Sequence, residues 1–296
     1  MTKLFDAYVV VDWHSGAKPA TGANSVWICT LKKNVRFALE PKLDNPPTRA
    51  QAEKIIDAAL SELTKRGDRV FIGFDFSLGF PRGTATRLKL KGDPAWRAMF
   101  DFLAAEIKDR PDNANNRFQV AAKINRLMSG EAFPFWGCPP KDVLTTLSST
   151  KARPHGPSDP PEHRHTDLAA KGAQAIWKLY GAGAVGGQSL VGIPMVARLK
   201  ASRGDAARIW PFETGWRSLS RDDLDGVQVV MAEVYPSLVT GKPGAGEVKD
   251  AAQVRAMAEH IARLDAEGRL AAAFGPRIRP DFADTVEAEE GWILGA

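Results

Sequence analysis

Residues 69–81 read RVFIGFDFSLGFP, an apolar run that carries one acid, Asp75, and then breaks at Gly79 and Pro81. β-Branched and aromatic residues bounded by turn residues predict a strand that is buried on both faces. An ionised carboxylate inside an apolar layer costs several kcal/mol unless a cation, a hydrogen-bond donor or water meets it. We therefore expect Asp75 to lie where this strand leaves the sheet.

The same pattern, an apolar strand that ends in one acid, occurs twice more. Residues 8–12 read YVVVD and end at Asp12, and residues 227–233 read VQVVMAE and end at Glu233. Open α/β sheets place their sites at the carboxyl ends of parallel strands. If these three strands are parallel neighbours, their acids meet there. The sequence therefore predicts an α/β fold with an acidic site at one edge of the sheet.

The composition is that of a globular protein without a membrane segment. The chain has 296 residues, 44% apolar and 25% charged, and no apolar run approaches the roughly 20 residues of a membrane span. The amino terminus lacks the pattern of a secretory leader, so we expect a cytoplasmic protein with no membrane partner. The formal charge of +5 permits a polyanionic partner. Two cysteines far apart in the sequence predict buried thiols.

The first 81 residues alternate between strand and helix signals. After the first strand and a turn-rich loop, residues 25–31 and 35–40 predict a hairpin. Thr48, with Gln51 three residues later, begins a predicted helix that Gly67 ends. Because such crossovers are right-handed, this helix can return the chain so that the Asp75 strand lies parallel to the first strand.

Residues 84–226 form an insertion of different character. Helical periodicity predicts four helices there, near residues 94–107, 115–128, 166–180 and 195–201. An aromatic segment at 133–140 and a proline-rich loop at 151–161 separate them. After the insertion, the chain returns to the Glu233 strand and then to a predicted helix at 250–267.

Three carboxylates at neighbouring strand ends suit magnesium or manganese, which prefer oxygen ligands and are held by few protein carboxylates. Two such ions, about 3.5–4 Å apart, can activate a water and stabilise the leaving oxygen of a phosphodiester. The alternative is that backbone donors or solvent satisfy each acid separately. That alternative stays open for each residue taken alone, and the recurrence of the pattern favours the metal site.

A fourth acid is expected near the start of the helix at 250–267. Asp250 is the first candidate, although its spacing to Gln253 is also that of an ordinary N-cap with a capping-box partner. Four acids near the C-terminus compete for the same role: Asp284, Glu287, Glu289 and Glu290.

Two further motifs have competing interpretations. GAGAVG at residues 181–186 matches a dinucleotide-binding pattern, but it follows a predicted helix rather than a strand, which favours a helix stop and a loop. The loop that carries His155, His163 and His165 could hold a transition metal, although its prolines favour a solvated loop.

Several single residues near these motifs are candidates for contacts with substrate. Arg164 is a candidate for substrate phosphate, and His14 is either a proton shuttle or an exposed turn residue. Three lysines are candidates for positioning phosphates: Lys18, Lys242 and Lys249.

The pieces VVVDWHSG, FIGFDFSLGFP and AEVYPSL together resemble the domain of unknown function 429 family, regarded as predicted nucleases of RNase H-like fold. In that family a first strand ends in Asp, a later strand is followed by D-x-P-x-G-L-P, and an E-x-x-P follows. This chain has Asp12 in the first motif, and Glu233 with Pro236 in the third. In the second it has Ser77 where the family often has proline, and Phe80 in place of leucine.

The resemblance implies one RNase H-like domain over residues 1–296, with a core of 1–83 and 227–296 around the mostly helical insertion at 84–226. It implies a mixed five-stranded sheet in the order 3-2-1-4-5, with the second strand antiparallel to its neighbours. The expected activity is that of a Mg²⁺- or Mn²⁺-dependent nuclease with a two-metal mechanism, acting on nucleic acid or a nucleotide. Its expected catalytic and metal-binding residues are Asp12, Asp75, Glu233 and Asp250.

Two other function classes remain open. Actin-like kinases and ATPases share this topology, and DWHSGAK at residues 12–18 would then be a phosphate loop, but such enzymes need two copies of the unit. A catalytically inactive scaffold is the third interpretation. It draws on aromatic residues in irregular segments, which can stack bases, pack a partner or close the insertion onto the core: Phe133, Phe135, Trp136, Trp210, Phe212 and Trp216.

Overall fold

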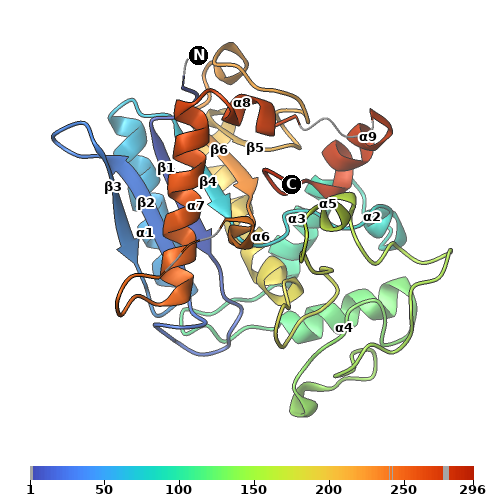
Figure 1. The fold of residues 1–296 in the computed structure, drawn as a ribbon. Helices are drawn as coiled ribbons and strands as arrows, with labels where there is room; N and C mark the ends of the chain where they lie inside the picture. Colours follow the sequence, from blue (N-terminus) through green and yellow to red (C-terminus); the bar gives the residue numbers. More distant parts are fainter. Residues whose placement is uncertain (1–2, 240, 242, 276–279) are drawn as a thin grey trace.

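The computed structural model of the chain describes residues 3–239, 241, 243–275 and 280–296. Its centre is a mixed six-stranded sheet in the order β3-β2-β1-β4-β6-β5 (Figure 1). The strands are β1 Ala7–Asp12, β2 Trp27–Lys33, β3 Leu39–Asp44, β4 Val70–Phe74, β5 Ala207–Ile209 and β6 Val229–Glu233. β2 is antiparallel to β1 and β3, and the pairs β1–β4, β4–β6 and β6–β5 are parallel.

The mixed α/β class is confirmed, and the expectation of five strands is wrong. The sixth strand, β5, lies at the edge of the sheet beside β6 and comes from the insertion. It has three residues and is followed by Trp210 and Pro211. The run ARIWPF at residues 207–212 is strand-like in sequence, but so short a run does not indicate that it joins the sheet.

The helices are α1 Arg49–Lys65, α2 Thr84–Arg87, α3 Ala95–Glu106, α4 Arg117–Met128, α5 His165–Ala169, α6 Gly186–Arg203, α7 Lys249–Ala266, α8 Leu270–Ala273 and α9 Ala283–Thr285. Short 3₁₀ turns occupy Pro140–Asp142, Gly204–Ala206, Asp222–Leu224, Pro236–Leu238 and Pro280–Phe282, and a π-helical turn occupies Val286–Glu290. The predicted start and end of α1 are confirmed, because Thr48 accepts a hydrogen bond from the Gln51 N–H at 3.3 Å and Gly67 adopts a positive φ.

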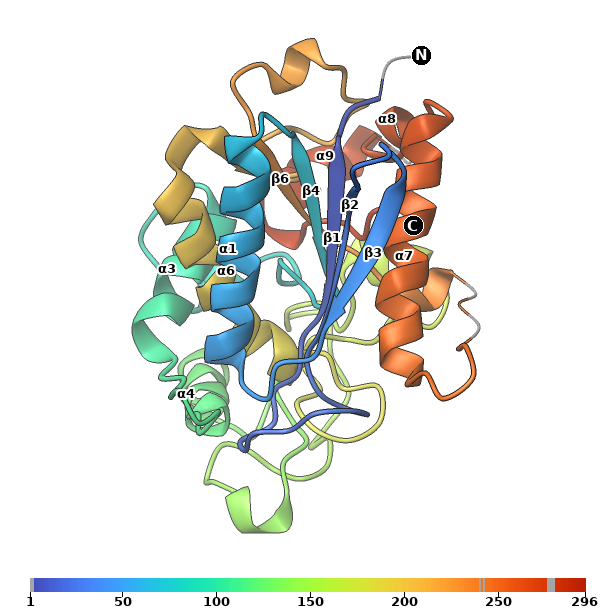
Figure 2. The ribbon, with the colours of Figure 1, turned by 90° about the vertical axis from the view of Figure 1, so that its left-hand side faces the viewer.

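Helices cover both faces of the sheet. Val9 and Val11 of β1 belong to the core that also contains residues of α1, α3 and α6. Tyr8 and Val10, which alternate with them, belong to the core that contains α7 and α8. Figure 2 shows α1, α3 and α6 on one side of the strands and α7 on the other. Two helices of the insertion, α3 and α6, therefore complete one of the two helical layers.

Two expectations for the insertion are wrong. The predicted helix at 166–180 ends at Ala169, because the chain turns at Gly172 with a positive φ and Trp136 then pairs with Lys178 in an isolated parallel bridge. The glycine-rich segment does not end a helix. Gly186 instead begins α6, which continues through Pro194 to Arg203.

The aromatic residues of the irregular segments close the insertion onto the core. Phe133, Phe135 and Trp210 are at most 1% exposed, and Trp216 is 8% exposed. Cys29 and Cys138 are buried free thiols, as predicted. Among the described helices, none combines the length and the apolar character that crossing a bilayer requires.

Candidate functional site

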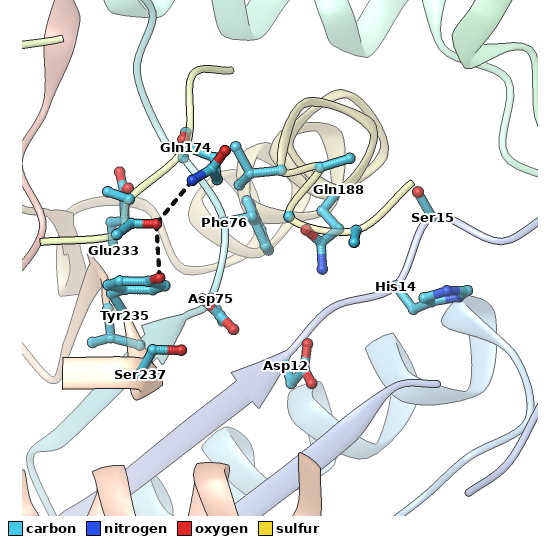
Figure 3. Close-up of a pocket in the computed structure, with 18 of the residues that line it drawn as sticks. Asp12, His14, Ser15, Asp75, Phe76, Gln174, Gln188, Glu233, Tyr235 and Ser237 are labelled. Carbon is cyan, nitrogen blue, oxygen red and sulfur yellow. Dashed lines mark hydrogen bonds between the residues drawn. The ribbon is translucent and has the colours of Figure 1, made fainter. Parts of the chain in front are cut away.

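A cavity of about 730 Å³ opens at the carboxyl ends of β1, β4 and β6. All four predicted acids line it: Asp12, Asp75, Glu233 and Asp250. The cavity is closed on other sides by residues 172–188 of the insertion and by the turn after β6 (Figure 3). The acids at three separate strand ends therefore lie at one edge of the sheet, as predicted.

Asp12 and Asp75 are neighbours across two parallel strands. Val11 pairs with Phe74, and the Asp75 N–H continues the ladder by donating to the Val11 carbonyl at 2.9 Å. The next residue in each strand is the acid, so the two backbones are one strand spacing apart, about 4.8 Å. Figure 3 shows both carboxylates directed into the cavity. Two negative charges therefore face the same space.

Electrostatics disfavours both charges in this arrangement. Burial, and then the Glu233 and Asp250 carboxylates, raise the pKa of Asp75 to about 7. Burial, and then Asp75 and Asp250, raise the pKa of Asp12 well above its ordinary range. No hydrogen-bond donor among the described residues lowers either pKa. A cation between the two carboxylates would relieve this repulsion.

The raised pKa of Asp75 predicts a pH-dependent gain in stability for Asp75→Asn. The folded protein keeps a proton that the unfolded chain releases between about pH 4 and 7, so ionisation destabilises the fold as the pH rises through this range. We expect metal-free Asp75→Asn to exceed the wild type by on the order of 2–4 kcal/mol at about pH 8 and to equal it at about pH 4. Urea unfolding at both pH values measures this difference. Asp101, an exposed acid on α3, is the control. A similar gain from Asp101→Asn would contradict the claim that the raised pKa of Asp75 causes the difference.

Asp250 lies in the first turn of α7 but does not cap the helix. The N-cap residue is Val248, so the capping interpretation is wrong. Asp250 instead accepts a hydrogen bond from the Asn24 N–H at 2.8 Å through Oδ2. Its other carboxylate oxygen has no donor among the described residues, and the residue lines the cavity.

None of the four competing acids near the C-terminus, Asp284 included, lines the cavity, and three of them have structural roles elsewhere. Glu289 accepts hydrogen bonds from the N–H groups of Gly83 and Ala85. Glu290 accepts from the Arg82 N–H, and Glu287 accepts from the Trp216 N–H. These bonds fix the turn after β4 and the C-terminal segment. Within the described part of the chain, Asp250 is therefore the candidate for the fourth acid that reaches the cavity.

Glu233 points to the other face of the sheet from Asp12 and Asp75. It pairs with Phe74, whose side chain belongs to the core under α1, α3 and α6. Asp12 pairs with Trp27, which packs against the core under α7. Because side chains alternate along a strand, Asp75 also turns toward α7, where Asp250 lies. Asp12, Asp75 and Asp250 therefore lie on the α7 side of the sheet, and Glu233 points to the other side.

Arg164 neutralises that glutamate. Its Nη1 and Nη2 donate to the two oxygens of Glu233, both at 2.7 Å, and its Nη2 and Nε donate to Asp167 at 2.8 and 3.3 Å. Nη1 also donates to the Glu290 carbonyl at 3.1 Å. All five N–H groups of this guanidinium, which is 1% exposed, therefore have acceptors. The hypothesis that Arg164 meets substrate phosphate is wrong, because no donor is left for it.

The histidines do not converge. His155 Nδ1 lies 2.8 Å from the Pro160 carbonyl, and His165 Nδ1 lies 2.7 Å from Glu290 Oε2. Among the described residues, no three His, Cys, Asp or Glu side chains form a preassembled metal site. A cation held by Asp12 and Asp75 would therefore gain Asp250 as a third ligand only if Asp250 moved. Of the three candidate lysines, Lys18 and Lys249 do not line the cavity, and Lys242 lies outside the described residues.

No family model, curated protein or solved structure matches this chain. The resemblance drawn from the three short motifs therefore stays a prediction, and function has to be argued from the cavity itself.

Several cavity residues were not expected from the sequence. Tyr235 donates its hydroxyl to the Gly172 carbonyl at 3.0 Å, and Gln174 donates to the same oxygen at 3.1 Å (Figure 3). Gln188 donates to the Trp13 carbonyl. Tyr235 lies within AEVYPSL, but nothing in that motif indicates its contact with Gly172. The Arg164–Asp167 pair had a usable signal, because opposite charges three residues apart meet on one side of a helical turn.

The glycines at the start of α6 allow close backbone contact in the cavity wall. A Cβ atom at Gly186 would overlap the Ile176 carbonyl, and one at Gly187 would lie 2.8 Å from Ser15 Oγ. We expect Gly186→Ala to destabilise the fold by about 3 kcal/mol, at the upper end of ordinary overpacking, because a backbone group has to move. Gly156→Ala is the control, since its Cβ would meet only Asp159 at 3.5 Å. Equal urea midpoints for the two variants would contradict the tight contact.

Proposed function

We propose that this protein is a metal-dependent hydrolase of phosphate esters, with a phosphodiester as the expected substrate. The observation that carries the proposal is the pair Asp12 and Asp75, which lie side by side at two parallel strand ends and face one cavity. Among the described residues, no hydrogen-bond donor lowers the pKa of either carboxylate. Such a pair costs stability in the absence of a ligand. A cation bound between the two carboxylates would offset this cost.

The chemistry of the donors suits Mg²⁺ or Mn²⁺, although among the described residues they are not preassembled as a metal site. Asp12 and Asp75 would supply carboxylate oxygens, and the free oxygen of Asp250 a third, which is the hard oxygen environment that these ions take. Glu233 is less suited to metal, because Arg164 already donates to both of its oxygens. The arrangement therefore favours one ion on the α7 side instead of the two expected from the sequence.

A bound divalent ion would polarise the phosphoryl oxygen and stabilise charge that develops during hydrolysis. The protein's own contribution is position and hydrogen bonding. His14 lines the cavity, and its Nδ1 accepts from the Gly16 N–H at 3.1 Å. Burial and the nearby Arg49 and Arg117 lower the pKa of His14, which favours a neutral ring with its proton on Nε2. His14 is therefore suited to donate a hydrogen bond from Nε2 to a substrate oxygen.

An RNase H-like arrangement is part of the proposal. Its support is the order of β3, β2, β1, β4 and β6 in the sheet, the antiparallel β2 and the crossover by α1. The actin-like alternative needs two facing copies of this unit, and the described residues contain one such sheet. The inactive-scaffold alternative has one specific observation in its favour, namely that Arg164 compensates Glu233.

A panel of labelled substrates tests the proposal. Single-stranded and duplex RNA and DNA, a branched junction and short oligonucleotides are incubated with Mn²⁺, with Mg²⁺ and with EDTA. We expect cleavage of at least one member that depends on the metal. Absence of cleavage across the panel, together with no stabilisation of the protein by millimolar Mn²⁺, would favour the scaffold.

A further inference from the structure

The walls of the cavity limit what can reach Asp12 and Asp75. Residues 172–188 lie opposite the strand ends and contribute mostly glycine, alanine and backbone. Tyr235 joins this wall to the turn after β6 through its hydrogen bond to Gly172. On the far side, the Ile293 N–H donates to the buried Thr166 Oγ1 at 2.9 Å. The acids therefore lie inside a recess that is held by hydrogen bonds from three parts of the chain.

The size of the recess matches a small ligand. Its volume of about 730 Å³ falls in the range of roughly 300–1,000 Å³ typical of small-molecule sites. Figure 3 shows the carboxylates of Asp12 and Asp75 beneath the insertion segments that carry Gln174 and Gln188. These insertion segments therefore border one side of the approach to the two acids.

The charge of the lining favours the same conclusion. Five carboxylates line the cavity: Asp12, Asp75, Asp167, Glu233 and Asp250. Among the described lining residues one is basic, Arg164, and its donors are all used within the fold. Long nucleic acids are bound along tracks of Lys and Arg that neutralise successive phosphates. Without such a track, a bound cation is the counter-charge that this lining can offer to a phosphate.

The recess also offers a place for a base. Tyr180 lines the cavity and is 54% exposed, so part of this aromatic side chain is accessible to a ligand. Aromatic rings stack on nucleobases without strict sequence preference. The neighbouring Gln174 and Gln188 supply amide groups for polar contacts.

From the volume of the cavity, the charge of its lining and the exposed Tyr180 together, we infer that the substrate is a small nucleotide of one or two residues, bound with its base on Tyr180 and its phosphate toward Asp12 and Asp75. This inference rests on the proposed phosphoesterase function and narrows it. Nucleotides beyond the first two then add no affinity at this site.

Binding as a function of length tests the inference. Mixed-sequence, 5′-phosphorylated phosphorothioate oligonucleotides of two, four, eight and sixteen nucleotides are titrated calorimetrically in Mn²⁺, at low and at physiological salt. We expect Kd to stay within about threefold across the lengths, with one shallow salt dependence, because added nucleotides lie outside the recess. We expect Tyr180→Ala to raise the dinucleotide Kd about tenfold. Leu168→Ala is the control, because Leu168 is 73% exposed in the same insertion and does not line the cavity.

Three other results are possible, and each would contradict a different part of the proposal. Affinity that rises more than about tenfold with length, with a steeper salt dependence, would overturn the small-nucleotide inference and leave metal-dependent hydrolysis in place. Failure of the dinucleotide to bind would also overturn the inference. Dinucleotide binding that Tyr180→Ala weakens but that Mn²⁺ does not affect would support the inference and overturn the proposed metal dependence.

Discussion

Asp12→Asn is expected to lower kcat/KM for the best substrate of the panel by at least about 1,000-fold in Mn²⁺. Loss of a ligand carboxylate removes several kcal/mol of transition-state stabilisation by the bound ion, and each 1.36 kcal/mol is tenfold in rate. The side chain keeps its shape, and the repulsion from Asp75 that helps to raise the pKa of Asp12 is removed. The variant should therefore be inactive and folded.

The matched control for activity is Asp101→Asn, an exposed acid on α3 outside the cavity. It should retain the wild-type rate within about twofold, since surface substitutions away from special features have small effects. Circular dichroism confirms folding of both variants. Equal cleavage by Asp12→Asn and the wild type would remove the assignment of the site to the strand ends.

Arg164→Met is expected to destabilise the protein by about 3–5 kcal/mol, because it leaves Glu233 and Asp167 buried without their cation. Glu233 is 4% exposed and Asp167 is 6% exposed, so solvent cannot replace the lost hydrogen bonds. Urea unfolding measures the loss. If the single variant does not fold, the triple variant Arg164→Met, Asp167→Asn, Glu233→Gln tests the same account, since it removes the buried charges together and should recover most of the stability.

The control for Arg164 is Arg198→Met on α6, which breaks the pair between Arg198 and Glu53. Arg198 is 57% exposed in its side chain, and exposed pairs contribute about 0–1 kcal/mol. A loss in Arg164→Met no larger than in Arg198→Met would show that Arg164 is not the charge partner that holds Glu233.

The sequence predicted the positions of the acids well because strand ends are local signals. An apolar run that ends in one acid marks both a strand and the place where its carboxylate emerges, and this is how Asp12, Asp75 and Glu233 were found. The helix start at Thr48 followed from capping chemistry in the same way. Register and strand neighbours then brought these residues together.

The chemical difference between the acids could not be predicted from the same pattern. Whether Glu233 is free or paired depends on Arg164, which lies 69 residues away in an irregular segment. Its direction depends on the register of β6 against β4, where a shift of one residue would turn the side chain to the other face. The wall formed by residues 172–188 depends on packing of the insertion, which local periodicity described incorrectly.

The central claim is that Asp12, Asp75 and Asp250 bind one divalent cation, while Glu233 stays paired with Arg164 and does not bind it. Isothermal titration of Mn²⁺ into wild type, Asp12→Asn and Glu233→Gln tests it most directly, because it does not depend on the substrate. We predict one ion per chain in wild type and in Glu233→Gln, and a Kd at least about tenfold weaker in Asp12→Asn, which is a loss of about 1.4 kcal/mol. Two ions per chain in wild type, or one ion whose Kd is unchanged in Asp12→Asn, would contradict the account.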